Sequence, residues 1–558
     1  MDLVLIGPPG SGKSAAGRRV AARHGVPFID LDDAIEASAG RPIPAIFETE
    51  GEAGFRARER EAIAAICARD DDRRPDVTRV VAVGGGAVID PRNRWRLFHG
   101  RRVIGLHAPA GVLLRRLRGA PVRPLLSGRD PRLLLDELLT ARARWYAAGE
   151  AVEAATGVAA VAARIEERLA LPAPAGTSLL RAETPIGRLT IGDGDAGPRL
   201  IEALAALGAA RVAVVSEPVA WRLHGARLAA ALSGAGLEVV PLLMPSGEAA
   251  KTVAAYGRLV RSLAAARLER GDPLVAIGGG ALGDAAGFAA ATYLRGVPLV
   301  HVPTTLVAQI DSSIGGKTAI DIPEGKNLVG AFHQPRAVVA DIALLATLPV
   351  RHRRAALGEA VKYAALGDEA LFGLLEREAG VLARGRRAFG SGAIAELVER
   401  CAWAKVEVVA GDEREQAGRV VLNLGHSIGH AVEAAAGYRR ILHGEAVACG
   451  LLGAVAVGLA CAVTPPDRAA RIRRLLATAG LAQDPPGVPE AAVRDLLARD
   501  KKHAAGRLRW VLPTGSGVTV RTDVPEEAVA AGIAAALAGG RAAPGAAETT
   551  RDMASARA

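Results

Sequence analysis

A phosphate-binding loop near the start of the chain constrains its fold more than any other feature. Residues 7–14 read Gly-Pro-Pro-Gly-Ser-Gly-Lys-Ser and fit the pattern GxxxxGK[ST], between an apolar run at Leu3–Ile6 and a helical pattern at Ser14–His24. In this setting, backbone N–H groups and a helix N-terminus cradle nucleotide phosphates. The pattern predicts a parallel α/β domain whose lysine reaches the β- and γ-phosphates and whose serine ligates Mg²⁺. The residues expected at the phosphates are Gly10, Ser11, Gly12, Lys13 and Ser14.

The 558 residues exceed what one hydrophobic core supports, so several folded regions are expected. Short apolar runs alternate with helical patterns over residues 1–170, and again at 185–340, after a Pro/Ala/Gly-rich stretch at 171–184 that is typical of a linker. This alternation predicts an α/β fold with parallel sheets and helices on both faces, the second region being Rossmann-like. Helical spacing dominates at 341–536 and predicts an all-helical subdomain, while low complexity at 537–558 predicts a disordered tail.

Composition excludes some partners. The net charge is +11, but the basic residues are scattered and no compact Lys/Arg run interleaves with aromatics, so we expect neither nucleic acid nor a membrane surface as partner. Residues 446–463 carry no charge and could span a bilayer, yet their Ala and Gly content and the following prolines favour a buried core helix. Four cysteines without a CxxC pair, and an N-terminus without a secretory signal, predict a cytoplasmic protein.

Several motifs follow the phosphate loop. They are Phe28-Ile29-Asp30-Leu31-Asp32-Asp33, Gly51-Glu52 with Phe55-Arg56, Val83-Gly84-Gly85-Gly86, Arg123-Pro124-Leu125-Leu126, and Arg142 four residues before Tyr146. Together, over nearly all of residues 1–170, these motifs resemble the shikimate kinases. The resemblance implies a P-loop kinase-type domain that transfers phosphate from ATP to shikimate and gives shikimate 3-phosphate.

The same resemblance assigns roles to the residues of these motifs. It implies that Asp32 contacts the ring hydroxyls of shikimate and helps to deprotonate the attacking one, and that Asp30 holds Mg²⁺ through water. Arg56 and Arg142 would clamp the substrate carboxylate, which suits a planar guanidinium. Arg123 would lie on a mobile lid, bind ATP and neutralise the transferring phosphoryl group. The remaining contacts with shikimate would come from Gly84, Gly85 and Gly86.

A second glycine-rich turn opens the next group of motifs. Gly278-Gly279-Gly280 follows the apolar run Leu274–Ile277, and Pro245-Ser246-Gly247-Glu248, residues 290–296, Pro303-Thr304-Thr305 and residues 311–318 surround it in the sequence. From about 185 to 536 these motifs resemble 3-dehydroquinate synthase, which implies bound NAD⁺. The residues implied at NAD⁺ are Glu217, Glu248, Lys251, Gly279, Gly280, Asp284, Thr304, Thr305, Lys317 and Lys326. Glu217 stands where the family commonly has Asp for the ribose.

A carboxylate and a group of imidazoles predict a catalytic metal site in the helical region. Gly358-Glu359 precedes the run Asn423-Leu424-Gly425-His426-Ser427-Ile428-Gly429-His430, and Leu442-His443-Gly444-Glu445 follows it. The two histidines four residues apart would share a helix face, so spacing alone allows both as ligands. The family resemblance instead gives Zn²⁺, or Co²⁺, the ligands Glu359, His426 and His443, and places His430 on the substrate.

The resemblance also implies the substrate and its shell. The synthase half would convert 3-deoxy-arabino-heptulosonate 7-phosphate to 3-dehydroquinate plus phosphate, with NAD⁺ removing and returning a hydride. Lys405 and Arg419 would pair with the substrate carboxylate, and Arg295 would reach the phosphate in a neighbouring subunit of a homodimer. The other substrate residues implied are Asp311, Lys317, Asn327, Lys362, Glu415, Asn423, His430 and Lys502. The residues expected to act directly in the two reactions are Lys13, Asp32, Arg123, Lys362 and His430.

Two other interpretations stay open. The second half could be a related sugar-phosphate cyclase acting on a neutral ketose phosphate, fused to a kinase for another small polyol; Lys405 with Arg419, and Arg56 with Arg142, argue for acidic substrates instead. Alternatively, the chain could be a basic binding or scaffold protein with inactive halves. Since the motif residues quoted above are intact, activity is the stronger prediction.

Overall fold

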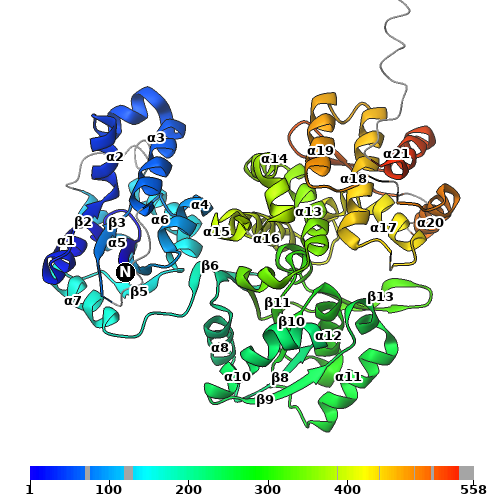
Figure 1. The fold of residues 1–558 in the computed structure, drawn as a ribbon, viewed down its shortest axis with the longest axis horizontal. Coiled ribbons are helices and arrows are strands. Elements are labelled where there is room, and N and C mark those ends of the chain that lie inside the picture. Colours follow the sequence, from blue (N-terminus) through cyan, green and yellow to red (C-terminus); the bar gives the residue numbers. More distant parts are fainter. Residues whose placement is uncertain are drawn as a thin grey trace, which may run out of the picture. The chain divides into compact units, whose positions relative to one another are not determined.

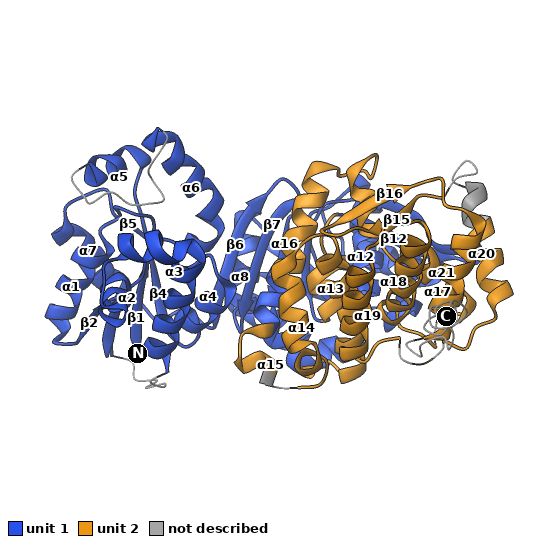
Figure 2. Ribbon diagram, turned by 90° about the horizontal axis from the view of Figure 1, so that it is seen from above, with its two compact units in different colours: residues 1–304, 316–346, 394–399 blue, residues 305–315, 347–393, 400–558 orange. Residues whose placement is uncertain are grey.

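The computed structural model of the protein describes residues 1–68, 76–118, 130–385, 387–438, 440–482, 484, 486–503 and 508–539, without the side chains of 387 and 499–503. These residues form two compact units (Figure 2). Unit 1 comprises residues 1–304, 316–346 and 394–399, and unit 2 comprises 305–315, 347–393 and residues from 400 onward. The predicted tail begins within the last helix, and from residue 540 it lies outside the described residues.

The N-terminal part of unit 1 is a parallel five-stranded sheet in the order β2-β3-β1-β4-β5 (Figure 1). Its strands are β1 (Asp2–Ile6), β2 (Phe28–Asp30), β3 (Arg79–Ala82), β4 (Arg102–His107) and β5 (Glu150–Glu153). Its helices are α1 (Lys13–His24), α2 (Leu31–Ala39), α3 (Ile43–Cys67), α4 (Pro91–Phe98), α5 (Ala110–Leu117), α6 (Pro131–Tyr146) and α7 (Val158–Leu169). Leu3 and Leu5 of the central strand pack on Val20 of α1 and Ile165 of α7, which buries one face of the sheet.

A seven-stranded sheet follows, in the order β6-β7-β14-β11-β10-β8-β9, and only the edge pair β6–β7 is antiparallel. The strands are β6 (Thr177–Thr184), β7 (Gly187–Asp193), β8 (Arg211–Ser216), β9 (Glu238–Leu243), β10 (Leu274–Gly278), β11 (Leu299–Pro303) and β14 (Ala337–Asp341). The helices are α8 (Ala196–Ala206), α9 (Pro218–Ala220), α10 (Ala226–Gly234), α11 (Val253–Ala265) and α12 (Gly280–Thr292). Strands β12 (Lys317–Ile322) and β13 (Gly325–Phe332) form a hairpin.

Alternate residues of the central strands face opposite layers of helices. Leu274 and Ala276 of β10 join a cluster with α11 and α12, whereas Val275 and Ile277 join a second cluster with α8 and α10. This period-two burial on both faces is the pattern of a doubly covered parallel sheet. The α/β prediction for this region, with a Rossmann-like arrangement, is confirmed.

Unit 2 is mainly helical, as predicted, and also contains a two-stranded hairpin. Its helices are α13 (Val350–Ala365), α14 (Glu369–Arg384), α15 (Arg387–Gly390), α17 (His426–Ala435), α18 (His443–Ala460), α19 (Pro466–Thr478), α20 (Glu490–His503) and α21 (Glu526–Ala538). Helix α16 (Ala393–Gly411) contributes residues to both units. The hairpin strands are β15 (Trp510–Pro513) and β16 (Val518–Arg521). Helix α18, the apolar segment long enough for a membrane, is largely buried among these helices.

The stretch 171–184 differs from the prediction of a linker. Its second half, Thr177–Thr184, is strand β6, which pairs antiparallel with β7 along its whole length. Helices α4 and α6 of the N-terminal sheet pack against β6. This strand was not predicted because the prolines and glycine at 172–176 are typical of a linker. The apolar alternation that indicates a strand begins only after them.

Candidate functional sites

The phosphate loop lies between β1 and α1, as predicted. Gly7, Gly10 and Gly12 have φ of 146°, 79° and 88°, which residues with a Cβ rarely adopt. Lys13 begins α1, and its Nζ donates to the carbonyls of Gly7 at 2.8 Å and Pro8 at 3.0 Å. The loop therefore folds around its own lysine, and no side chain among the described residues caps the N-terminus of α1.

A cavity of about 500 Å³ adjoins this loop. It is lined by Gly10, Ser11, Gly12, Lys13, Ser14, Asp30, Asp32, Gly84, Gly85, Arg116 and the segment 156–158, among others. The sequence interpretation missed Arg116, which donates to the carbonyls of Gly10 at 3.3 Å and Thr156 at 2.6 Å. Nothing in the sequence distinguishes it from Arg115 beside it. The predicted Arg123 lies outside the described residues.

Two of the predicted acids sit at the start of α2. Asp30 is the N-cap of this helix, and its Oδ1 accepts a hydrogen bond from the Asp32 backbone N–H at 3.1 Å. This cap fixes the direction in which the following residues leave the sheet. The Asp33 side chain, in contrast, is exposed and pairs with Arg18 at 3.3 Å.

The three-glycine loop after β3 brings the other predicted residues together. A Cβ built on Gly84 would lie 2.9 Å from Asp32 Oδ1, and one on Gly86 would lie 2.7 Å from both terminal nitrogens of Arg56. On Gly85, the carbonyl accepts from Arg142 Nη1 at 3.1 Å. The absence of side chains therefore lets this backbone reach an acid and two arginines, beside the phosphate loop.

Two further side chains support these residues. Tyr146 donates its hydroxyl proton to the Gly85 carbonyl at 2.6 Å. Glu59, which sequence reasoning missed, is buried and accepts from Arg56 Nη1 at 2.9 Å. Burial raises the pKa of Glu59, although the charge of Arg56 opposes this. Glu59 lies three residues after Arg56 on α3, so helical spacing could have revealed it.

The predicted NAD⁺ residues of unit 1 gather around the turn Gly247–Lys251. Lys251 is buried, its Nζ lies 2.7 Å from Asp284 Oδ2, and it also bonds to Asn327. Lys326 pairs with Glu248 at 3.0 Å. Glu217, at the end of β8, accepts from the Gly247 backbone N–H at 3.1 Å. Asn327, which was predicted at the substrate phosphate, is thus held among these residues.

The glycines after β10 shape the neighbouring turn. Gly278 ends the strand, and its carbonyl accepts from the Thr304 backbone N–H at 2.9 Å. Gly279 is the N-cap of α12, so the first N–H groups of this helix follow the strand directly. Of the other residues predicted at NAD⁺, Thr305 directly follows Thr304 and belongs to unit 2, and Lys317 is exposed on unit 1. Arg295, which was predicted at the substrate phosphate, is also exposed on unit 1.

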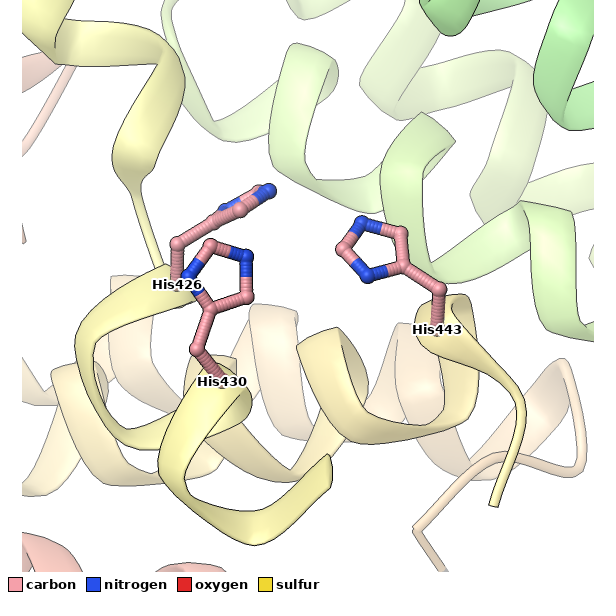
Figure 3. A group of neighbouring side chains, drawn as sticks. All are labelled: His426, His430 and His443. Carbon is pink, nitrogen blue, oxygen red and sulfur yellow. The ribbon is translucent and has the colours of Figure 1, made fainter. Parts of the chain in front are cut away.

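In unit 2, the three predicted metal ligands lie close together. Glu359 Oε1 lies 3.1 Å from His443 Nε2 and 3.5 Å from His426 Nε2, and Glu359 is fully buried. His430 is also close, because one ligand atom from each of the three histidines lies within 4.8 Å of the others. Figure 3 shows the three rings turned toward one another from α17 and α18. Geometry alone therefore leaves His430 near enough to ligate.

The second nitrogen of two of these rings is already engaged. His426 Nδ1 lies 3.1 Å from the Leu424 carbonyl, and His443 Nδ1 lies 3.0 Å from Glu433 Oε2. Such partners orient an imidazole so that Nε2 faces the metal. Glu433 is buried and was missed by sequence reasoning, because only the fold places it beside His443. The donor set fits a divalent metal.

Glycines allow the helices that carry these ligands to touch through their backbones. A Cβ on Gly444 would lie 1.9 Å from the Ala355 carbonyl oxygen, and one on Gly358 would lie 2.2 Å from the Gly444 carbonyl oxygen. Helices α13 and α18 therefore cross closely enough to bring Glu359 beside His443.

Buried charges continue from the metal-type site. Lys362 Nζ lies 2.5 Å from Glu359 Oε2 and 3.7 Å from Asp311 Oδ1, and Lys405 Nζ lies 2.9 Å from the same Asp311 atom. Burial would raise the pKa of Asp311, but the two lysines hold it well below its usual range. The pKa of Glu359 is likewise held low against burial, first by Lys362 and then by His426. Tyr363, also missed by sequence reasoning, donates to Asp311.

The other predicted substrate residues take three different positions. Asn423 Nδ2 donates to Glu415 Oε1 at 2.8 Å, so these two lie together. Arg419 is buried and donates to the carbonyls of Gly315 at 2.8 Å and Glu413 at 2.6 Å. The side chain of Lys502 lies outside the described part of the chain.

Comparisons with known proteins agree with this geometry. A 3-dehydroquinate synthase of a Synechococcus strain is 45% identical over 319 residues, which cover 57% of this chain and 86% of the relative. One from Paracoccus denitrificans is 46% identical over 334 residues, covering 59% and 90%. The chain belongs to the 3-dehydroquinate synthase family. The family profiles "3-dehydroquinate synthase N-terminal" and "3-dehydroquinate synthase C-terminal" match residues 241–355 and 356–503.

The N-terminal domain has its own match. The family profile "Shikimate kinase" matches residues 9–170. The protein is therefore a fusion of two shikimate-pathway enzymes, a shikimate kinase followed by a 3-dehydroquinate synthase, as the motifs predicted. Among solved structures, 2-epi-5-epi-valiolone synthase from Streptomyces hygroscopicus, solved with NAD⁺ and Zn²⁺, covers 62% of this chain and 96% of its own at 29% identity and a TM-score of 0.57.

Proposed function

We propose that the kinase half transfers phosphate from ATP to shikimate at the cavity beside the phosphate loop. The observation that carries this proposal is the convergence of Asp32, Arg56 and Arg142 on the three-glycine loop. An acid beside two guanidinium groups suits a hydroxyl nucleophile on a ring that carries a carboxylate. Lys13 would hold the β- and γ-phosphates, and Arg123 would neutralise the transferring group.

Ser14 and Asp30 would hold Mg²⁺, which when bound neutralises phosphate charge. Both line the cavity. Asp30 keeps one oxygen on the start of α2 through the Asp32 N–H, so its other oxygen can face the cavity. Asp32 would take the proton of the attacking hydroxyl, while the glycine backbone excludes water from that side of the ring.

For the second half, we propose conversion of 3-deoxy-arabino-heptulosonate 7-phosphate to 3-dehydroquinate. Glu359, His426 and His443 would hold Zn²⁺ or Co²⁺, which when bound makes a substrate hydroxyl easier to deprotonate. Glu217, Asp284 and the turn at Gly279–Gly280 would hold NAD⁺, which exchanges a hydride with the substrate. The convergence of Glu359 with two imidazoles carries this proposal.

The buried lysines support an acidic substrate. Burial and the charge of Lys362 lower the pKa of Lys405 despite the opposing charge of Asp311. An anionic group would therefore stabilise the charged form of this lysine. A cyclase for a neutral ketose phosphate would offer no such partner for Lys405 and Arg419. His430, beside the metal ligands, would bind the substrate phosphate.

One assay tests both halves. The purified chain should show ATP-dependent phosphorylation of shikimate and release of phosphate from the heptulosonate phosphate in the presence of NAD⁺. Lys13→Ala should silence the first activity and spare the second, and His426→Ala should do the reverse. If both activities fall together in either variant, or if neither substrate pair turns over, the assignment of the two sites is wrong.

We also propose that the synthase half forms a homodimer, in which Arg295 reaches the phosphate in the neighbouring subunit. Exposed apolar side chains of unit 1 support this: Leu294, next to Arg295 in the chain, is 39% exposed, and Leu328 and Phe332 of β13 are 62% and 46% exposed. Sedimentation equilibrium should give twice the mass of the chain, and Leu328→Lys should shift it toward the monomer. A cytoplasmic location is proposed too, supported by four cysteines that are all free.

A further inference from the structure

The kinase half contacts the beginning of α16, a helix of the synthase half. Residues 394–399 of this helix belong to the same compact unit as the kinase domain. Glu396 pairs with Arg92 of α4 at 2.7 Å, and Glu399 pairs with Arg94 of the same helix. Arg94 is fully buried, so its ion pair with Glu399 lies inside the protein and not on its surface.

Glu399 has a second partner in the kinase half. Its Oε1 accepts from Trp145 Nε1 on α6 at 3.1 Å, while its Oε2 binds Arg94. Two guanidinium groups lie over the Trp145 ring, with Arg94 at 5.2 Å and Arg144 at 4.2 Å from its centre. One carboxylate of the synthase half therefore joins two helices of the kinase half.

Both of these helices hold the loop that carries the three glycines. Arg94 donates to the carbonyls of Val88 and Ile89, the latter at 3.0 Å, just after the glycines. Tyr146, next to Trp145, donates to the Gly85 carbonyl at 2.6 Å. The loop is thus held at its middle glycine by Tyr146, the neighbour of one partner of Glu399, and just after its last glycine by Arg94, the other partner.

We propose that Glu399 of the synthase half is a positioning residue for the shikimate site of the kinase half. It holds α4 and α6 together. Because these helices contact the three-glycine loop and α6 carries Arg142, it thereby positions the loop and Arg142. The inference rests on the proposed substrate site at that loop. A buried, charge-assisted contact of this kind has two discrete states, made or broken, and can therefore couple an interface to a binding site.

The test measures shikimate binding to the full chain by calorimetry, together with KM and kcat of the kinase. Glu399→Gln keeps the size of the side chain and removes its charge. It should weaken shikimate binding and raise KM for shikimate by about fivefold or more, the lower range of coupling between sites. The KM for ATP, kcat and the synthase activity should stay within about twofold, since Glu399 touches none of their residues.

Two controls and a second variant separate positioning from general damage. Glu396→Gln removes another charge pair from the same junction, and Glu407→Gln alters an exposed side chain further along α16. Neither should change shikimate binding by more than about twofold. Trp145→Phe keeps an aromatic ring and the ion pair but loses the indole N–H, and should shift KM in the same direction by a smaller factor.

The outcomes distinguish this inference from the proposed function. If Arg142→Met weakens shikimate binding while Glu399→Gln and Trp145→Phe do not, the proposed kinase site stands and the positioning role of Glu399 is refuted. If none of the three weakens binding, the substrate site itself is misplaced and both ideas fall. A fall in kcat together with equal rises in the KM values for ATP and shikimate in Glu399→Gln would indicate a merely structural contact and refute the positioning role.

Discussion

The kinase cavity and the metal-type site of unit 2 present polar groups in different ways. In the kinase half, glycine loops bring backbone groups and partly exposed side chains to a cavity beside the start of α1. In unit 2, the buried side chains of Glu359, Lys362 and Lys405 and the partly buried Asp311 balance one another through contacts within about 4 Å. The first site is prepared by backbone conformation and the second by compensated charge, so substitutions should affect stability differently in the two.

The largest effect should come from removing one charge at each site. Glu359→Gln leaves Lys362 buried with one carboxylate fewer and should destabilise unit 2 by about 3–5 kcal/mol, besides abolishing synthase activity. Asp32→Asn should lower the kinase kcat by about 10²–10⁴-fold. Its effect on stability should stay below about 1 kcal/mol, because Asp32 lies at an open cavity.

Denaturant titration of both variants, followed by activity of the refolded chains, checks this contrast. His352→Gln, at an exposed position of α13, provides the baseline for a harmless substitution in unit 2. A Glu359→Gln protein as stable as the wild type would show that the buried charges do not depend on one another.

The seven-stranded sheet contains a buried histidine that predicts how stability changes in acid. His301 of β11 is buried, and burial together with the charge of His333 lowers its pKa to about 4. Since the unfolded histidine titrates near 6.5, the unfolded state binds the proton first as the pH falls. The contribution of His301 to the free energy of unfolding is therefore fully present above pH 6.5. It is lost between pH 6.5 and 4 and amounts to about 3 kcal/mol at most.

His301→Gln should remove this part of the acid sensitivity. Unfolding midpoints measured at pH 7.5, 5.5 and 4.5 should converge with falling pH between variant and wild type. Parallel curves across this range would mean that the pKa of His301 is the same in the folded and unfolded states, and would contradict the prediction.

Much of this architecture was predictable because short stretches of sequence determine it. The phosphate loop, the three-glycine turns and the apolar runs at β1, β10 and β11 each specify a conformation within a few residues. Strand β6 was missed because its pairing with β7 depends on a turn at 185–186 and on an edge that only the folded sheet provides. Glu433 and Tyr363 were missed because their partners, His443 and Asp311, are distant in sequence.

Glycine substitutions sharpen the same comparison. Gly444→Ala would place a Cβ 1.9 Å from a backbone oxygen of another helix, and neither backbone can yield cheaply. It should destabilise unit 2 by about 2–3 kcal/mol and weaken the metal site. Gly86→Ala would meet only the flexible end of Arg56, so it should cost under about 1 kcal/mol and chiefly raise KM for shikimate. Equal thermal shifts for the two variants would contradict the distinction between backbone and side-chain neighbours.

The smallest effect concerns a residue that touches no substrate in either proposal. Glu433 holds His443 Nδ1 at 3.0 Å from behind, so Glu433→Gln keeps the side-chain volume but weakens the orientation of the imidazole. Metal affinity should fall by about 10–100-fold, measured by competition with a chromophoric chelator, with synthase activity restored at high Zn²⁺.

Glu407→Gln, which alters an exposed side chain, should leave the affinity unchanged. Kinase activity should not respond, because its cavity depends on backbone groups of unit 1. Unaltered metal affinity in Glu433→Gln would instead mean that His443 is positioned by the contact of α13 with α18 at Gly358 and Gly444 alone.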